Sequence, residues 1–138
     1  MAYEKERKVA IEAVISACRL CCEVQADLLS RDAINKGDRT PVTVADFGAQ
    51  ALISHHLKTA FPDDLMVGEE DSRLLRQTEN RGAKEAVVKI VHRFKPHLSP
   101  LDVLDAIDRG TAEIDAGKGM NIDEARRRTR ADIGAGNE

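Results

Sequence analysis

Residues 36–46 read KGDRTPVTVAD, and residues 61–70 read FPDDLMVGEE. The first stretch has turn chemistry around Gly37, because glycine adopts positive φ without steric cost. In the second stretch, Pro62 ends a preceding helix, and the short apolar run Leu65–Val67 predicts a buried strand. A turn, a helix and a strand that ends in acidic residues together predict a mixed α/β architecture.

The neighbouring segments predict the other elements of this architecture. Apolar residues recur near a 3.6-residue period over residues 4–29 and again over 43–61, which is typical of two long helices. We also expect a β-hairpin over residues 33–42 and shorter helices over 85–94 and 99–110. The side chains that would form the apolar face of the first helix are Val9, Val14, Ala17, Cys21, Val24 and Leu28.

Two helix starts carry capping signals. Thr43 is predicted as an N-cap, with Asp46 at the third helical position, from which an acid can reach back to the cap. Ser99 is predicted as the cap of a later helix, with Asp102 in the equivalent position. That later helix is expected to end at Gly110.

The composition defines the broad class of protein. The chain has 138 residues, of which 42% are hydrophobic and 33% are charged, as in an ordinary soluble globular domain. A net charge of −3 provides no basic field, so neither nucleic acid nor membrane is an expected partner. No apolar run approaches the roughly 20 residues of a transmembrane helix. The first residues resemble neither a secretory signal nor an organelle presequence, so we expect a cytoplasmic location.

The composition changes near the C-terminal end of the chain. We expect residues 1–116 to form the N-terminal part of one domain. Residues 117–138 contain few apolar side chains and are predicted to be a disordered tail, because they bury too little surface to offset the entropy of ordering. The basic run at residues 125–130 is interpreted as part of this solvated tail.

Acidic residues of the two opening stretches could form a metal site. Asp46 lies in the first turn of a predicted helix, and Glu69 and Glu70 follow the predicted strand, where open α/β sheets place their ligand sites. Mg²⁺ usually takes one or two carboxylates together with waters and substrate phosphate. One carboxylate can hold the metal while another orients or deprotonates the attacking water. The simpler alternatives are a capping role for Asp46 and solvated charges at Glu69 and Glu70.

The same residues carry a resemblance to a known family. The pattern K-x-D-x-(S/T)-P-V-T-x-x-D followed by G-E-E, with 23 positions from Asp46 to Glu69, is similar to the inositol monophosphatase superfamily. The stretches FPDDLMVGEED (61–71) and LSPLDVLDAIDRGTAE (98–113) resemble its 3′(2′),5′-bisphosphate nucleotidase branch. The resemblance covers roughly residues 3–115.

This resemblance implies a Mg²⁺-dependent, lithium-inhibited phosphatase of sulfur metabolism that acts on 3′-phosphoadenosine 5′-phosphate. It also implies a layered α+β sugar-phosphatase fold, of which this chain would hold an N-terminal fragment: two long helices, a hairpin, the first strand of the sheet and short helices. By position, Glu69 matches a metal ligand and Asp46 matches the catalytic aspartate that helps to activate water. The further candidates beside the metal or the substrate are Lys36, Asp38, Thr43 and Glu70.

One part of the family pattern is missing. The central D-P-(I/L)-D-G-T motif, which supplies two metal-binding aspartates in the family, does not occur in this chain. The near match Asp105–Thr111, DAIDRGT, is interpreted as part of a helix, in which the Ile107 carbonyl is already hydrogen-bonded. We therefore expect a chain that is cut or altered after Ala116.

Three hypotheses remain open from the sequence. The first is an active bisphosphate nucleotidase, and the second is a truncated, inactive fragment that binds a metal or a partner weakly at most. The third is a helical interaction protein unrelated to phosphatases. In a fragment, part of the apolar helix face would have no sheet to cover, so exposed hydrophobic surface or self-association is expected.

The cysteines and the paired histidines invite a zinc interpretation. Zinc takes about four ligands, and no second cluster of suitable spacing accompanies them. Cys18 and Cys22 are therefore predicted to be buried core residues, and His55 and His56 to lie at the surface of a helix. With Cys21 these thiols are confined to one segment, which does not form a disulfide framework and fits the cytosol.

Overall fold

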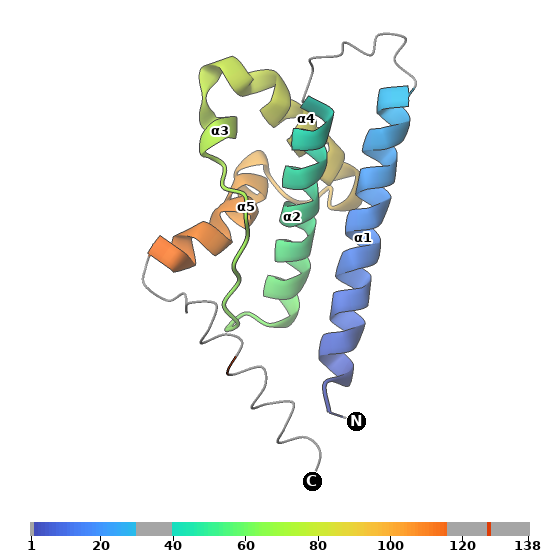
Figure 1. The fold of residues 1–138 in the computed structure, drawn as a ribbon, viewed down its shortest axis with the longest axis vertical. Coiled ribbons are helices and arrows are strands. Elements are labelled where there is room, and N and C mark those ends of the chain that lie inside the picture. The colour runs from blue at the N-terminus through green and yellow to red at the C-terminus, as the bar shows by residue number, and fades with distance from the viewer. Residues whose placement is uncertain (1, 30–39, 116–126, 128–138) are drawn as a thin grey trace.

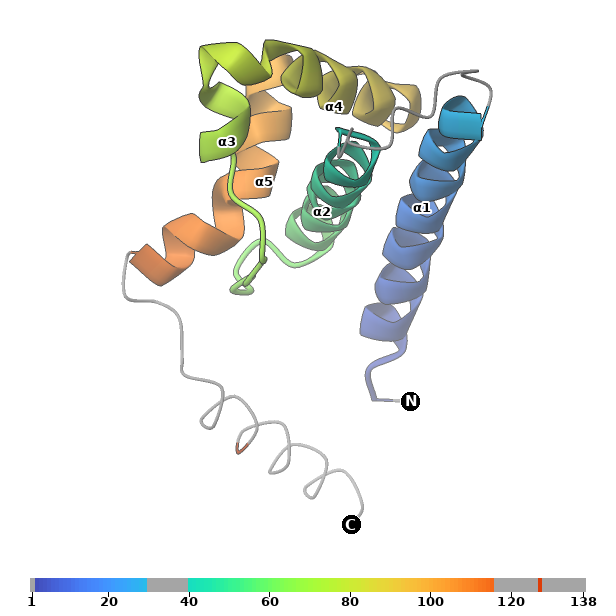
Figure 2. The same cartoon turned by 45° about the horizontal axis from the view of Figure 1, so that its top comes forward.

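The computed structural model describes residues 2–29, 40–115 and Arg127, and the secondary structure of these residues is helical (Figures 1 and 2). No strand occurs among them, so the α/β architecture is not confirmed. The predicted tail lies outside the described residues apart from Arg127. The helices are α1 (Glu4–Leu29), α2 (Thr40–Ala60), α3 (Arg73–Arg76), the 3₁₀ helix η1 (Thr78–Asn80), α4 (Arg81–Phe94) and α5 (Pro100–Asp115).

Helix α2 is the centre of this arrangement. It lies beside α1 and also contacts α4 and α5 (Figure 1). Helix α4 crosses over the end of the α1–α2 pair at which α1 finishes and α2 begins, as the tilted view of Figure 2 shows. None of the helices in the described ranges combines the length and the apolar composition that crossing a bilayer requires.

The hydrophobic core forms where α2 meets these three helices. Close approach of α1 and α2 depends on Gly48, because an added Cβ there would lie 3.0 Å from both terminal carbons of Leu20. Helix–helix packing of this kind provides most of the stability of short helices. The buried core residues are Leu20, Val44, Phe47, Ala51, Leu52, Leu75, Val87, Ile90, Val91, Val103, Leu104, Ala106 and Ile107.

The predicted helix over residues 4–29 is confirmed, but its buried face differs from the predicted one. Ala13, Ala17 and Leu20 are buried, whereas Val14 is 54% exposed and Cys21 is exposed. Within the described residues α1 packs only against α2 and α4, so it buries one narrow face. Apolar residues on the opposite face therefore stay in contact with solvent.

The prediction of a buried cysteine pair is wrong. Cys18, Cys21 and Cys22 are all exposed. Cys18 and Cys22 lie on the same side of α1 as Val14, away from the packed face, because residues four apart share one face of a helix.

Helix α2 begins earlier than predicted. It starts at Thr40 and includes Pro41 in its first turn, where the missing proline N–H costs no intrahelical hydrogen bond. The predicted strand at residues 41–42 and the predicted cap at Thr43 are therefore wrong. The other residues of the expected hairpin, with Lys36 and Asp38, lie outside the described residues.

The predicted buried strand at residues 65–67 is also wrong. These residues form no regular secondary structure, and Leu65 and Val67 are 49% and 65% exposed. A strand requires a neighbour that completes its backbone hydrogen bonds. The part of the chain that the structure describes offers no such neighbour.

The start of α5 confirms the predicted cap. The Ser99 hydroxyl accepts a hydrogen bond from the Asp102 N–H (3.1 Å), and the Asp102 carboxylate accepts one from the Ser99 N–H (2.8 Å), which completes a capping box. The predicted end at Gly110 is wrong, since α5 continues to Asp115. A glycine ends a helix when it adopts positive φ, and it is otherwise tolerated inside one.

Candidate functional site

Gln50 connects the acidic segment to two helices. It lies on α2, one turn after Asp46, and its side-chain Nε2 donates to the Glu70 carbonyl (2.7 Å) and to the Ile107 carbonyl of α5 (2.8 Å). Its Oε1 accepts a hydrogen bond from the Glu70 N–H (3.0 Å). The two bonds to Glu70 hold the segment after residue 67 against α2, and the third joins α5 to the same point.

Gly68 makes room for this contact. A Cβ built on Gly68 would lie 2.7 Å from the amide carbon and nitrogen of Gln50, which is closer than real Cβ contacts allow. The Gly-Glu-Glu motif is therefore tied to α2 through two of its three residues, by a close approach at Gly68 and by hydrogen bonds at Glu70.

The carboxylates near this contact interact electrostatically. The pKa of the Glu70 carboxyl is raised, first by partial burial and then by the negative charges of Asp46, Glu69 and Asp71. Asp46 and the Gly-Glu-Glu segment therefore lie within electrostatic reach. The structure thus brings the predicted catalytic turn of α2 close to the predicted metal-binding segment, while a shared cleft for Asp46 and Glu69 stays a prediction.

This region contains the kind of side chains that bind a hard cation, but the described structure does not arrange them as a metal site. Carboxylate oxygens are the ligands that Mg²⁺ prefers, and Asp46, Glu69 and Glu70 supply them. Among the described residues, however, no group of three or more His, Cys, Asp or Glu side chains is arranged to hold a metal ion. Thr43 lies in the first turns of α2, and its side chain is outside the described set.

The near match at residues 105–111 is helical, as predicted. Asp108 accepts hydrogen bonds from the Ser72 N–H (2.5 Å) and hydroxyl (2.6 Å), and from Arg76 Nη2 (3.0 Å). Burial of Asp108 raises its pKa, but these hydrogen bonds outweigh burial, so its net pKa is lowered. Asp105 lies 3.8 Å from the same Arg76 nitrogen. These aspartates therefore join α3 to α5.

The histidines of α2 form a separate cluster. His55 and His56 are half-buried, and the His55 ring centroid lies 5.6 Å from that of His97. His56 Nε2 shares a hydrogen bond with the Ser16 hydroxyl (3.1 Å). Burial, followed by the charge of Lys95, lowers the pKa of both α2 histidines, so each favours the neutral form at pH 7.

A helical unit that holds a Gly-Glu-Glu segment beside an acidic helix turn is consistent with part of a phosphatase, and comparison with curated proteins makes the class specific. A 3′(2′),5′-bisphosphate nucleotidase of Schizosaccharomyces pombe is 44% identical over 111 residues, which are 78% of this chain and 31% of the relative. The 3′(2′),5′-bisphosphate nucleotidase 1 of Arabidopsis thaliana is 42% identical over 123 residues, 82% of this chain and 35% of the relative. A further Arabidopsis thaliana protein, provisionally named a mitochondrial 3′(2′),5′-bisphosphate nucleotidase, is 46% identical over 117 residues, 78% of this chain and 28% of the relative. No protein-family profile matches the chain.

Over these residues the chain is a homologue of the 3′(2′),5′-bisphosphate nucleotidases, and it corresponds to their N-terminal part. The resemblance inferred from the two motifs is therefore confirmed. The chain spans only about a third of the length of these relatives. The mitochondrial name of one relative leaves the expected cytoplasmic location unconfirmed.

Proposed function

We propose that this chain carries part of the active site of a Mg²⁺-dependent phosphatase that removes the 3′-phosphate of 3′-phosphoadenosine 5′-phosphate. The observation that supports the proposal is the pair of hydrogen bonds between Gln50 and Glu70, which holds the Gly-Glu-Glu segment against α2 at a residue one turn after Asp46. In this proposal the Glu69 carboxylate holds the metal, and Asp46 orients or deprotonates the attacking water. Bound Mg²⁺ would supply charge neutralisation at the phosphate oxygens.

The other predicted residues have supporting roles in this proposal. Glu70 adds negative charge beside Glu69, and its pKa is raised first by burial and then by the charges of Asp46 and Glu69. Lys36, Asp38 and Thr43 are proposed to lie beside the metal or the substrate. The finer fold belongs to the same proposal: these helices would form the N-terminal part of a layered α+β sugar-phosphatase fold.

A second candidate function is a non-catalytic module that binds a metal weakly or binds a partner. The observation that favours it is the exposed apolar face of α1, where Ile11, Val14 and Ile15 are 52%, 54% and 45% exposed. A contiguous apolar face of this kind is typical of an interaction surface.

An assay of phosphate release separates the two candidates. We predict that the 138-residue chain releases no phosphate from 3′-phosphoadenosine 5′-phosphate at millimolar Mg²⁺, because the sequence lacks the D-P-x-D-G-T aspartates and Glu69 supplies a single metal-binding carboxylate. Turnover that lithium inhibits and that Glu69→Gln abolishes would establish the enzyme for this chain.

Metal binding can be measured without turnover. Titration with paramagnetic Mn²⁺ is expected to broaden the backbone NMR signals of Asp46, Glu69 and Glu70 before others, and Glu69→Gln should weaken this effect. Glu79→Gln, an exposed acid of η1, is the matched control and should leave it unchanged. Broadening that begins elsewhere, or that survives Glu69→Gln unaltered, would contradict the assigned role of Glu69.

A further inference from the structure

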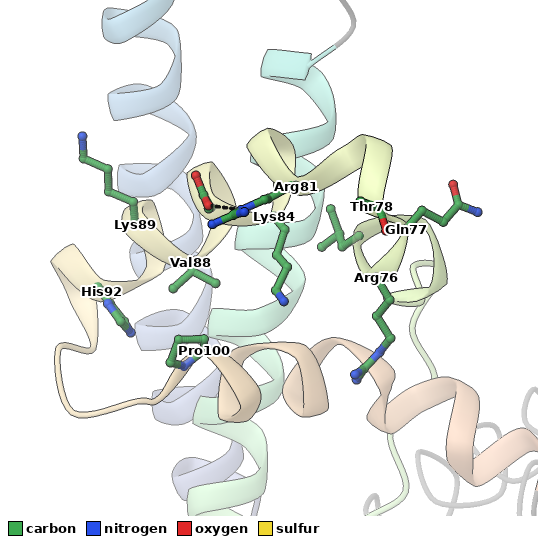
Figure 3. A pocket seen from close by; sticks show the side chains of 11 residues that line it. Arg76, Gln77, Thr78, Arg81, Lys84, Val88, Lys89, His92 and Pro100 are labelled. Atoms are coloured by element: carbon green, nitrogen blue, oxygen red, sulfur yellow. Dashed lines mark hydrogen bonds and ion pairs between the residues drawn. The ribbon is translucent and has the colours of Figure 1, made fainter.

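A groove of about 700 Å³ lies between α3, η1, α4 and the start of α5 (Figure 3). It shares no lining residue with the Asp46–Glu70 region. Its apolar lining includes Leu75, which is 1% exposed, together with Val88 and Pro100. Pockets that take small organic molecules have volumes of roughly 300–1,000 Å³ and are mostly apolar with a few fixed polar groups. The groove matches both properties.

Arg76 is a fixed cationic group at one edge of this groove (Figure 3). Its Nε donates to the hydroxyl of the buried Ser72 (2.6 Å), and its Nη2 donates to Asp108 (3.0 Å). Its Nη1 makes no hydrogen bond within the described residues. The guanidinium is therefore held in place while one nitrogen stays available, which lowers the entropic cost of binding an anion.

Lys84 supplies a second cation to the same space. In Figure 3 its side chain extends from α4 toward α5, between Val88 and Arg76, and it has no ion-pair partner among the described residues. Glu85, the acidic residue that lines the groove, is already paired with Arg81 (2.9 Å). The lysine charge is therefore not neutralised by a neighbouring carboxylate.

Lys89 provides a contrast on the same helix. It also lines the groove, but its side chain points away from Lys84 and Arg76 in Figure 3. The two lysines have the same charge and belong to the same helix, but only Lys84 extends over the apolar lining of the groove. Lys89 is therefore a matched control for Lys84.

We propose that this groove binds a small organic phosphate monoester, with the phosphate between Lys84 and Arg76 Nη1 and the apolar body against Leu75, Val88 and Pro100. A phosphate monoester carries a charge of about −1.5 to −2 at pH 7, which suits one unpaired lysine and one partly available guanidinium. Arginine and lysine also donate charge-assisted hydrogen bonds to phosphate oxygens. This site is additional to the proposed phosphatase site and uses none of its residues.

The test is an NMR titration of the full chain with phenyl phosphate at constant ionic strength. Binding in the groove should shift the amide signals of Leu75, Lys84 and Val88 in a saturable manner. Lys84→Ala and Lys84→Gln should each weaken binding about tenfold, the usual effect of losing a charged hydrogen bond. Lys89→Ala should change it by less than about twofold, because exposed charges contribute little. Far-UV circular dichroism checks that the variants keep their helices.

Two further probes separate the contributions of the head group and the apolar lining. Inorganic phosphate should bind more weakly than phenyl phosphate, because it leaves the apolar lining uncovered. Benzoate, a monoanion with the same ring, should also bind more weakly. Equal losses in the Lys84 and Lys89 variants, equal binding of inorganic and phenyl phosphate, or signal shifts centred on Asp46 and Glu70 would each overturn the proposal.

Discussion

Gln50 makes three hydrogen bonds to the backbone groups of Glu70 and Ile107, at 2.7, 2.8 and 3.0 Å. At the scale of single residues, this side chain sets where the Gly-Glu-Glu segment lies. A buried backbone group that loses its partner costs free energy comparable to a lost hydrogen bond. The Gln50 side-chain amide therefore fixes the position of Glu70 beside α2. The placement of the acidic segment relative to Asp46 depends on this neutral side chain.

Replacing Gly68 by alanine tests this arrangement. The added Cβ would lie 2.7 Å from the Gln50 amide, so the amide must move and its hydrogen bonds weaken. We expect a loss of about 1–3 kcal/mol in the free energy of unfolding, measured by urea denaturation. Gly82→Ala is the control, since nothing lies within 4 Å of a Cβ there. Because Gly82 is inside α4, that change should stabilise the protein by roughly 0.5–1 kcal/mol.

A second substitution makes the argument specific to Gln50. In a Gln50→Ala background the added methyl group at Gly68 has space, so Gly68→Ala should cost much less than it does in the wild-type protein. An undiminished cost in that background would show that the strain arises elsewhere in the backbone.

The sequence identified Asp46 and Glu69 as candidate site residues, but it did not identify Gln50. Asp46 and Glu69 were identified from local sequence alone, because a carboxylate at a helix start and another after an apolar run can bind a metal ion or water. Gln50 bonds to backbone groups 20 and 57 positions away in the chain, and these contacts exist only once α2, the acidic segment and α5 have packed. The only local signal was its place one turn after Asp46, on the same face of the helix.

At the scale of elements, the helices were predictable because their signals are local. The 3.6-residue period of residues 4–29 and the Ser99–Asp102 capping box depend on residues within a few positions of one another. The strand prediction at residues 65–67 failed because a strand depends on a neighbour that no local pattern reveals. The face of α1 was also mispredicted, since the period alone does not say which apolar residues meet another helix.

The hydrogen bonds that connect Asp108 of α5 to Ser72 and Arg76 predict a pH-dependent stability. The folded-state pKa of Asp108 is lowered from 3.8 by its hydrogen bonds to Ser72 and Arg76, which outweigh burial. The unfolded chain therefore binds this proton more readily, so the contribution of Asp108 is fully present above about pH 5 and is lost as pH falls through its folded-state pKa. Asp108→Asn should cost about 1–3 kcal/mol at pH 7, because charged hydrogen bonds are lost.

Urea unfolding between pH 7 and pH 2 measures this dependence. The difference between wild type and Asp108→Asn should shrink as pH falls through the folded-state pKa of Asp108, because the wild-type carboxyl then also becomes neutral. Asp63→Asn is the control, because Asp63 is exposed and has no ion pair in the described ranges. A constant difference at every pH would mean that the asparagine acts through packing rather than through lost charge.

At the scale of the whole molecule, the exposed apolar face of α1 is the feature that most needs a partner. Ile11, Val14, Ile15, Cys18 and Cys22 recur at helical spacing and lie opposite the side on which Ala13, Ala17 and Leu20 are buried. The chain spans about a third of its relatives, and no described element covers this face. The sequence predicted exposed hydrophobic surface, because the helices of a fragment would have no sheet to cover. It did not identify which residues form that surface.

Self-association through this face is the last prediction. From Ile11 to Cys22 the face extends about 17 Å along α1, which is small compared with the roughly 800 Å² per partner of a stable interface. We therefore expect weak association, seen as a molar mass that rises with concentration in sedimentation or light scattering under reducing conditions, which keep the exposed thiols from cross-linking. Ile15→Lys should abolish the rise without lowering the melting temperature, because Ile15 is 45% exposed and contributes little to the core. Leu101→Lys, at a 59% exposed position on α5, should leave the rise unchanged. A monomeric mass at every concentration, or equal effects of both lysines, would refute association through α1.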